Sequence, residues 1–146
     1  MPSDHEQFFL LERFAMVGDS SARPFPKLTY ANLKGLGKKV YAVDLSGAEQ
    51  VEGDTNHLAL DQLPGPVQGV IIELPKEKTA GVVEAAAALG VKDIWIHMGC
   101  ETPEALALCQ ENGIRVRTGT CAVMYTKQGF SYHSIHKWIM KMSGKY

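Results

Sequence analysis

Five short apolar segments, spaced along most of the chain, constrain the fold more than any other feature of this sequence. Each has three to five residues and stops at turn residues such as Gly18, Asp44 or Pro75. None shows the regular alternation of apolar and polar residues that marks a half-exposed strand, so we expect strands buried on both faces, as in parallel sheets. The five segments are residues 14–17, 40–43, 70–74, 94–96 and 114–116.

Helical patterns occupy the stretches between these segments. We expect crossover helices at 28–36, 77–89 and 102–111, each followed by a glycine (Gly37, Gly90 and Gly113). The third is the best marked, because Thr102 is a suitable N-cap and Pro103 takes the first helical position. The second would bury one face, formed by Val82, Val83, Ala86 and Leu89.

Strands that alternate with helices through short links predict a Rossmann-like doubly wound α/β fold, with a mainly parallel five-stranded sheet and helices on both faces. The 146 residues suit one domain, which we place at 14–124 after a helical lead-in at 1–13. Residues 125–146 form a predicted helical tail that packs on the same domain. One helical face of this tail carries Ile135, Trp138, Ile139 and Met142, and a dimer contact or a basic surface is the alternative.

Charge and cysteine content narrow the class of protein. The chain has fifteen Lys and Arg residues and sixteen Asp and Glu residues, so it lacks the global positive field of a non-specific nucleic-acid binder. Three cysteines without a C-x-x-C pair suit reduced thiols in the cytoplasm. An acidic N-terminus is unlike a signal peptide, and no apolar run approaches the roughly 20 residues of a membrane span. We therefore expect a cytoplasmic protein without nucleic-acid or membrane partners.

Ligands of open α/β sheets bind beyond the carboxyl ends of the strands, which directs attention to four loops. These are residues 18–27, 44–47, 74–77 and 98–101. The first joins Gly18 to small hydroxyl residues and two cations, a composition that suits a phosphate site. Asp44 follows Gly18 by 26 positions, which leaves open a ribose contact in a nicotinamide cofactor, NAD(P), or an exposed turn.

The sequence shows no set of residues with the spacing of a known catalytic site. His97 and Cys100 have a metal-like spacing, and His133 and His136 form an i, i+3 pair, but further ligands are missing, so we predict no metal site. Cys121 follows the last strand and fits either a small buried residue or a thiol that reaches the ligand cleft. No nucleophile with a base can be built from spacing.

Read together, the loops resemble those of the small CoA-binding domain family, which is related to the CoA-binding domain of the succinyl-CoA synthetase α subunit. The resemblance covers residues 14 to about 124. The segments that carry it are Ala15–Ser21 (AMVGDSS), Lys39–Asp44 (KVYAVD), Val70–Pro75 (VIIELP), Ala88–Gly99 (ALGVKDIWIHMG) and Asn112–Cys121 (NGIRVRTGTC).

The resemblance implies a site for CoA. The loop of Gly18, Asp19, Ser20 and Ser21 would meet the diphosphate, with Arg23 and Lys27 adding positive charge. The residues after the second strand, Asp44, Leu45 and Ser46, would flank the adenosine. Leu74, Pro75 and Lys76 would line the cofactor together with Met98 and Gly99. Asp19 and Asp44 depart from the family pattern and add negative charge, so their replacement by Ala and Asn is expected to tighten CoA binding.

The loops and the lack of an assembled nucleophile or acid-base group together predict a non-catalytic protein that binds or senses CoA or acyl-CoA, or an accessory subunit of a partner. The alternative is an NAD(P)-binding oxidoreductase or a relic of one. Cys121 is a candidate partner for the CoA thiol in a mixed disulfide, and the apolar terminal helices allow a homodimer or a protein partner.

Overall fold

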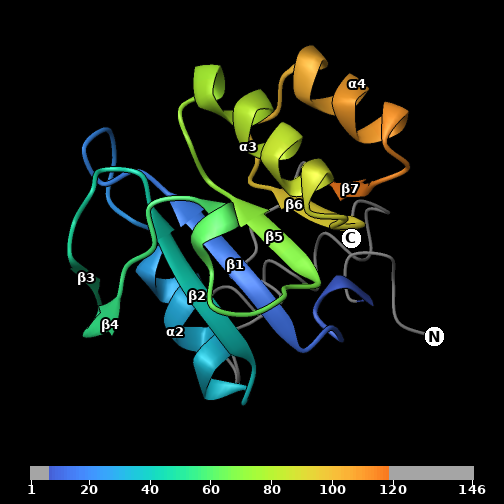
Figure 1. The fold of residues 1–146 in the computed structure, drawn as a ribbon. Coiled ribbons are helices and arrows are strands. Elements are labelled where there is room, and N and C mark those ends of the chain that lie inside the picture. The colour runs from blue at the N-terminus through green and yellow to red at the C-terminus, as the bar shows by residue number, and fades with distance from the viewer. Residues whose placement is uncertain (1–6, 119–146) are drawn as a thin grey trace, which may run out of the picture.

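Five strands form the sheet at the centre of the structure, a computed structural model that describes residues 7–118. They are β1 (Arg13–Gly18), β2 (Lys39–Asp44), β5 (Gly69–Ile72), β6 (Asp93–Ile96) and β7 (Arg115–Arg117). Their order across the sheet is β2, β1, β5, β6, β7 (Figure 1). Every neighbouring pair is parallel and every strand overlaps a predicted segment, so the predicted sheet is confirmed.

The chain reverses its direction of travel across the sheet at β1. It adds β2 on one side of β1 and then returns to add β5 on the other side. The register sets Gly18 beside Asp44 and Val17 beside Ile72, so the loops after these three strands start at one edge. The crevice at such a switch point, beyond the carboxyl ends of the strands, is where open α/β sheets receive ligands.

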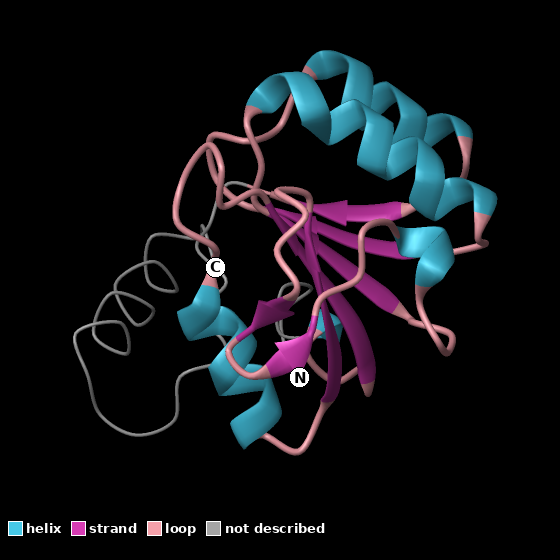
Figure 2. Cartoon of the chain, turned by 60° about the vertical axis from the view of Figure 1, so that its left-hand side comes forward, coloured by secondary structure: helices cyan, strands magenta, loops and turns pink. Residues whose placement is uncertain are grey.

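The helices cover both faces of the sheet, as predicted. The helix α2 (Lys27–Gly35) lies on one face, and α3 (Lys76–Ala88) and α4 (Pro103–Glu111) lie on the other (Figure 2). Their bounds agree with the predicted bounds to within one residue. The predicted N-cap is also confirmed, because the Thr102 hydroxyl accepts a hydrogen bond of 3.0 Å from the Ala105 N–H.

The buried face of α3 differs from the prediction. Thr79, Val83 and Ala86 are buried, whereas Val82 is only partly buried and Leu89 is exposed. The Thr79 hydroxyl donates a hydrogen bond of 2.8 Å to the Cys100 carbonyl, which ties the first turn of α3 to the loop after β6. This bond turns Thr79 inward, and Leu89 lies beyond the last helical residue.

A small hairpin after β2 was not predicted. It consists of β3 (Gln50–Val51) and β4 (Asp54–Thr55), and the short helix η1 (Leu60–Gln62) follows it. Glu52 and Gly53 both have positive φ, the geometry that a two-residue hairpin turn requires. Next to the hairpin, Asn56 accepts from the Asp44 N–H (2.7 Å) and donates to the Asp44 carbonyl (3.0 Å). The segment after β4 therefore braces the carboxyl end of β2.

On the α2 face, an aromatic cluster joins the start of the described chain to the sheet. Phe8, Phe9 and Phe14 pack around the buried Trp95, with 4.9 Å between the ring centroids of Phe9 and Trp95. The Arg117 guanidinium lies 5.5 Å from the centre of the Phe8 ring. It also donates to Asp93 (2.7 Å).

Two predicted segments extend past the described residues. Of the predicted lead-in helix, residues 1–6 lie outside them, and only residues 7 and 8 of the remainder are helical. The predicted tail, together with Cys121, also lies outside them. Within residues 7–118, no helix combines the length and apolar character that crossing a bilayer requires.

Two glycine substitutions test the packing of the sheet. A Cβ on Gly69 would lie 2.9 Å from Phe8 and 3.1 Å from Phe14, whereas a Cβ on Gly81 in α3 would meet no atom within 4 Å. Gly69→Ala should therefore lower the free energy of unfolding by about 1–3 kcal/mol. Gly81→Ala, the matched control, should raise it by about 0.5–1 kcal/mol, because alanine restricts the unfolded chain. Urea denaturation measures both values, and equal stability of the two variants would contradict the aromatic packing.

Candidate functional site

The loop after β1 starts with a close approach that only glycine permits. A Cβ on Gly18 would lie 2.8 Å from Pro26 and 3.0 Å from Phe25, because the loop folds back over the end of β1. The Asp19 carbonyl accepts hydrogen bonds from the N–H groups of Ala22 (3.0 Å) and Arg23 (3.1 Å), which makes the turn tight. The loop thereby presents Ser20 and Ser21 at the carboxyl edge of the sheet.

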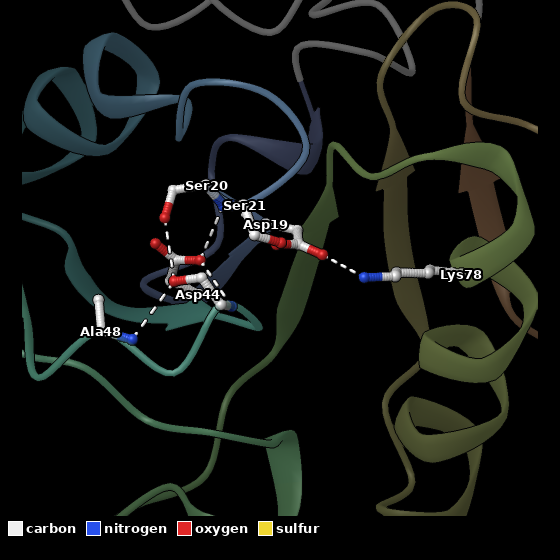
Figure 3. Close-up of polar contacts among 7 residues, drawn as sticks. Asp19, Ser20, Ser21, Asp44, Ala48 and Lys78 are labelled. Atoms are coloured by element: carbon white, nitrogen blue, oxygen red, sulfur yellow. Dashed lines mark hydrogen bonds and ion pairs between the residues drawn. The ribbon is translucent and has the colours of Figure 1, made fainter.

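Asp44 joins this loop to the loop after β2. Its Oδ1 atom accepts hydrogen bonds from the N–H groups of Ser20 (2.9 Å) and Ser46 (3.0 Å), and the two serine hydroxyls bond to each other (3.0 Å) (Figure 3). Burial alone would raise the pKa of Asp44, but the hydrogen bonds from Ser20 and Ser46 outweigh it and leave the pKa lowered. Asp44 is only 2% exposed, so the interpretation as an exposed turn residue is wrong.

Asp19 is neutralised within the protein. Its Oδ1 atom accepts from the N–H of Ser21 (3.0 Å), and its Oδ2 atom forms an ion pair with the Lys78 ammonium in the first turn of α3 (Figure 3). The Lys78 hydrogen bond, followed by the Ser21 hydroxyl, holds the pKa of Asp19 below its ordinary value. The negative charge that the sequence placed against a phosphate is therefore already balanced.

Arg23 connects the first loop to the ends of β5 and β6. Its guanidinium lies 3.3 Å from Glu73 Oε1 and 3.7 Å from the sulfur of Cys100, and the same Glu73 oxygen lies 3.5 Å from His97 Nε2. Burial raises the pKa of the Cys100 thiol, so this sulfur is a poor nucleophile.

The structure thus brings together the predicted residues of the loops after β1 and β2. It also adds residues that the sequence did not indicate. Gly18, Asp19, Ser20, Ser21, Asp44, Leu45 and Ser46 form one hydrogen-bonded unit. Lys78 and Glu73 are new members of the site. A cation in the first turn of a helix interacts unfavourably with the helix dipole. This unfavourable position was the one sequence feature that could have indicated a special role for Lys78.

The other predicted site residues lie outside this hydrogen-bonded unit. The Leu74 side chain is 1% exposed and belongs to the hydrophobic core, so only its backbone can face a ligand. Pro75 is the N-cap residue of α3 and Lys76 follows it on the surface, while Met98 and Gly99 are exposed after β6. Lys27 is exposed at the first position of α2, and Cys121 lies outside the described residues. Within residues 7–118, no three His, Cys, Asp or Glu side chains are grouped so as to hold a metal ion.

A small apolar slot adjoins the Asp44 loop. Its volume is about 90 Å³, and it lies between the ends of β1 and β2, helix α3 and η1. The side chains of Val17, Val43, Leu45 and Val82 form much of its wall. An apolar surface thus lies beside the polar loop.

Replacing Lys78 by Met should destabilise the protein, because Asp19 would lose its counter-charge. Stability that a lowered carboxyl pKa provides is fully present above the ordinary pKa of aspartate and is lost as the pH falls through the lowered value. The deficit of Lys78→Met in urea denaturation should therefore be largest near pH 7 and shrink under acid conditions. Lys76→Met, an exposed lysine two positions away, is the control, and the same stability in both variants would refute the role of the ion pair.

Comparison with known proteins identifies a matching family and solved structures of the same fold. The family model described as a CoA binding domain matches residues 12–127. Solved structures with this fold include a hypothetical protein of Pyrococcus horikoshii OT3, at 22% identity and a TM-score of 0.75, covering 84% of this chain and 87% of that one. A conserved hypothetical protein of Pyrococcus furiosus has 21% identity and a TM-score of 0.68, covering 79% of this chain and 99% of that one.

A larger enzyme contains a similar unit. The dinucleotide forming acetyl-coenzyme A synthetase 1 of Ca. Korarchaeum cryptofilum has 25% identity and a TM-score of 0.61, and the match covers 77% of this chain but 27% of that one. No curated protein sequence matches the chain. The family match spans most of the 146 residues. The chain therefore belongs to the CoA binding domain family.

Proposed function

We propose that this protein binds CoA or an acyl-CoA at the switch point, as a non-catalytic binding or sensing protein or as an accessory subunit. Family membership supports CoA or a related nucleotide as the ligand. The observation that carries the proposal is the hydrogen-bonded unit that Asp44 builds from the loops after β1 and β2. It holds Ser20 and Ser21 at the position where doubly wound sheets bind phosphates.

The diphosphate of CoA would bind by replacing the carboxylates that now pair with two cations, Lys78 and Arg23. Lys78 and Arg23 are each about 43% exposed and are held by Asp19 and Glu73, so both cations can turn toward an anion in the crevice. Hydrogen bonds between such cations and phosphate oxygens are about twice as strong as neutral ones. The serine hydroxyls of the loop supply further donors.

The rest of the cofactor would extend along the sheet edge in both directions. On the β2 side, the apolar slot beside Leu45 offers a surface for one edge of the adenine ring. On the β5 and β6 side, Pro75, Lys76, Met98 and Gly99 border the path of the pantetheine arm. The match to one part of a larger acetyl-coenzyme A synthetase supports an accessory role for this chain. We propose that the same fold relates it to the CoA-binding domain of succinyl-CoA synthetase.

Two features support a role in binding without catalysis. The described thiols, Cys100 and Cys109, are both buried, and burial raises the pKa of each. Glu73 is shared between Arg23 and His97, so its carboxylate serves to position other groups.

Thermal denaturation tests the ligand. A ligand present at 100 times its dissociation constant should stabilise the native state by about 2.7 kcal/mol, which shifts the melting temperature by several degrees. We expect this shift with CoA and a smaller one with NADH at equal concentration. An unchanged melting curve in millimolar CoA would refute the proposal, and a shift with NADH alone would favour the oxidoreductase reading.

Asp44 permits a sharper test, because a single atom, Oδ1, accepts the hydrogen bonds from Ser20 and Ser46. Asp44→Asn can keep that oxygen as an acceptor and removes a negative charge beside the ligand, so CoA should bind several-fold more tightly. Asp44→Ala is the matched control. It removes the charge and the acceptor together, so CoA binding should weaken as Ser20 and Ser46 lose their common partner. Calorimetric titration measures both, and similar effects of the two variants would contradict the role of the Oδ1 atom.

A further inference from the structure

A basic groove lies at the other end of β2 from the CoA site. Its volume is about 390 Å³, and α2, β2 and the β3–β4 hairpin line it; these elements lie together on one side of Figure 1. Its charged wall consists of Lys34, Lys38, Lys39 and Asp54. Lys39 starts β2 and Asp44 ends it, so the Cα atoms of these two residues are about 16 Å apart.

One wall of the groove is fixed and electrically balanced. The Tyr30 hydroxyl donates a hydrogen bond of 2.6 Å to Asp54 Oδ2, and the Lys34 ammonium pairs with the same oxygen. Tyr30 is buried, so it holds the Asp54 carboxylate in place. Asp54 is therefore held between Tyr30 and Lys34, and it also attracts the Lys39 ammonium, so one carboxylate serves two of the three lysines.

Lys38 and Lys39 carry charge that the described residues compensate poorly. The Lys38 side chain is only 13% exposed, yet its acidic partner, Glu12, is 71% exposed and lies 3.4 Å away. Ion pairs with such an exposed partner contribute little. The Lys39 ammonium lies 4.9 Å from the centre of the Tyr41 ring, and within residues 7–118 no carboxylate forms an ion pair with it. The groove thus holds three ammonium groups against one carboxylate in its wall, Asp54, and one exposed carboxylate outside it, Glu12.

We propose that this groove is a second binding site, specific for the phosphate chain of a small multiply charged anion. Lys38 and Lys39 supply the positive charge, and His57, packed edge-on to Tyr41 with 5.6 Å between the ring centroids, also lines the groove. A cavity of this volume is in the range that small ligands occupy. The chain's own residues 119–146 do not match it in charge, because they contain four lysines and no Asp or Glu.

The site is independent of the CoA proposal, since it shares no residue with the loops at the carboxyl edge. Its test therefore requires an anion probe, and variants that distinguish binding in the groove from binding at the CoA site. The probe is tripolyphosphate, titrated into the full chain by calorimetry at constant ionic strength, with ATP as a second ligand. ATP binding alongside tripolyphosphate would identify a nucleotide as a source of the phosphate chain, and tripolyphosphate binding alone would identify a free one; both outcomes support the site.

The double variant Lys38→Gln/Lys39→Gln should weaken tripolyphosphate binding at least tenfold and leave the CoA response unchanged. The control, Lys27→Gln/Lys76→Gln, removes two exposed lysines at the carboxyl edge and should retain the tripolyphosphate affinity of the groove. Unchanged affinity in the first variant, loss in the control alone, or no binding of either probe would overturn the proposal.

A measurement on the unmodified chain covers the case in which the first variant does not fold. In amide NMR spectra, added tripolyphosphate should shift the signals of Lys39, Tyr41 and His57. Shifts confined to Ser20, Ser21 and Ser46 would assign all phosphate binding to the carboxyl edge and would overturn the second site.

Discussion

The contact between Asp44 and the backbone of the first loop is the interaction on which the functional edge depends. A buried carboxylate is stable only when hydrogen bonds or counter-charges replace its lost hydration, and Asp44 obtains that replacement from two N–H groups in two different loops. One carboxylate oxygen therefore contacts both loops, and the Ser20–Ser46 hydroxyl bond and the Leu45 N–H bond to the Gly18 carbonyl join them as well. Asn56 supports the same residue from behind by bonding to its backbone N–H and carbonyl, so the unpredicted segment after β4 is part of the construction of the site.

The fold was accessible from the sequence because its signals are local. Apolar runs such as residues 94–96 identify buried strands by themselves, and the Thr102–Pro103 pair marks a helix start within a few residues. The hairpin was missed because strands of two residues carry no pattern, although Gly53 marks its turn. The buried face of α3 was misjudged because the hydrogen bond from Thr79 to Cys100 joins residues 21 positions apart.

The site was less accessible because its polar contacts are long-range. Asp19 and Lys78 are 59 positions apart, and Arg23 and Glu73 are 50 apart, so nothing in either local sequence indicates the pairing. Single aspartates in turns are usually exposed, and this general expectation gave the wrong environment for Asp44. The resemblance to a family predicted residues at the carboxyl edge of the sheet, and the structure brings those after β1 and β2 together. It gave no information on how their charges are paired.

The pairing of cations at the edge also determines how an anion approaches it. An unpaired cluster of Lys and Arg projects a field that gathers anions from a distance and accelerates association. Lys78 and Arg23 are matched by Asp19 and Glu73, so these two cations project little field beyond their immediate surroundings. A phosphate gains from these cations only after it has arrived, at contact distance. If the proposed phosphate ligand binds here, these two cations would contribute to selectivity through hydrogen-bond geometry at contact and would contribute little to attraction from a distance.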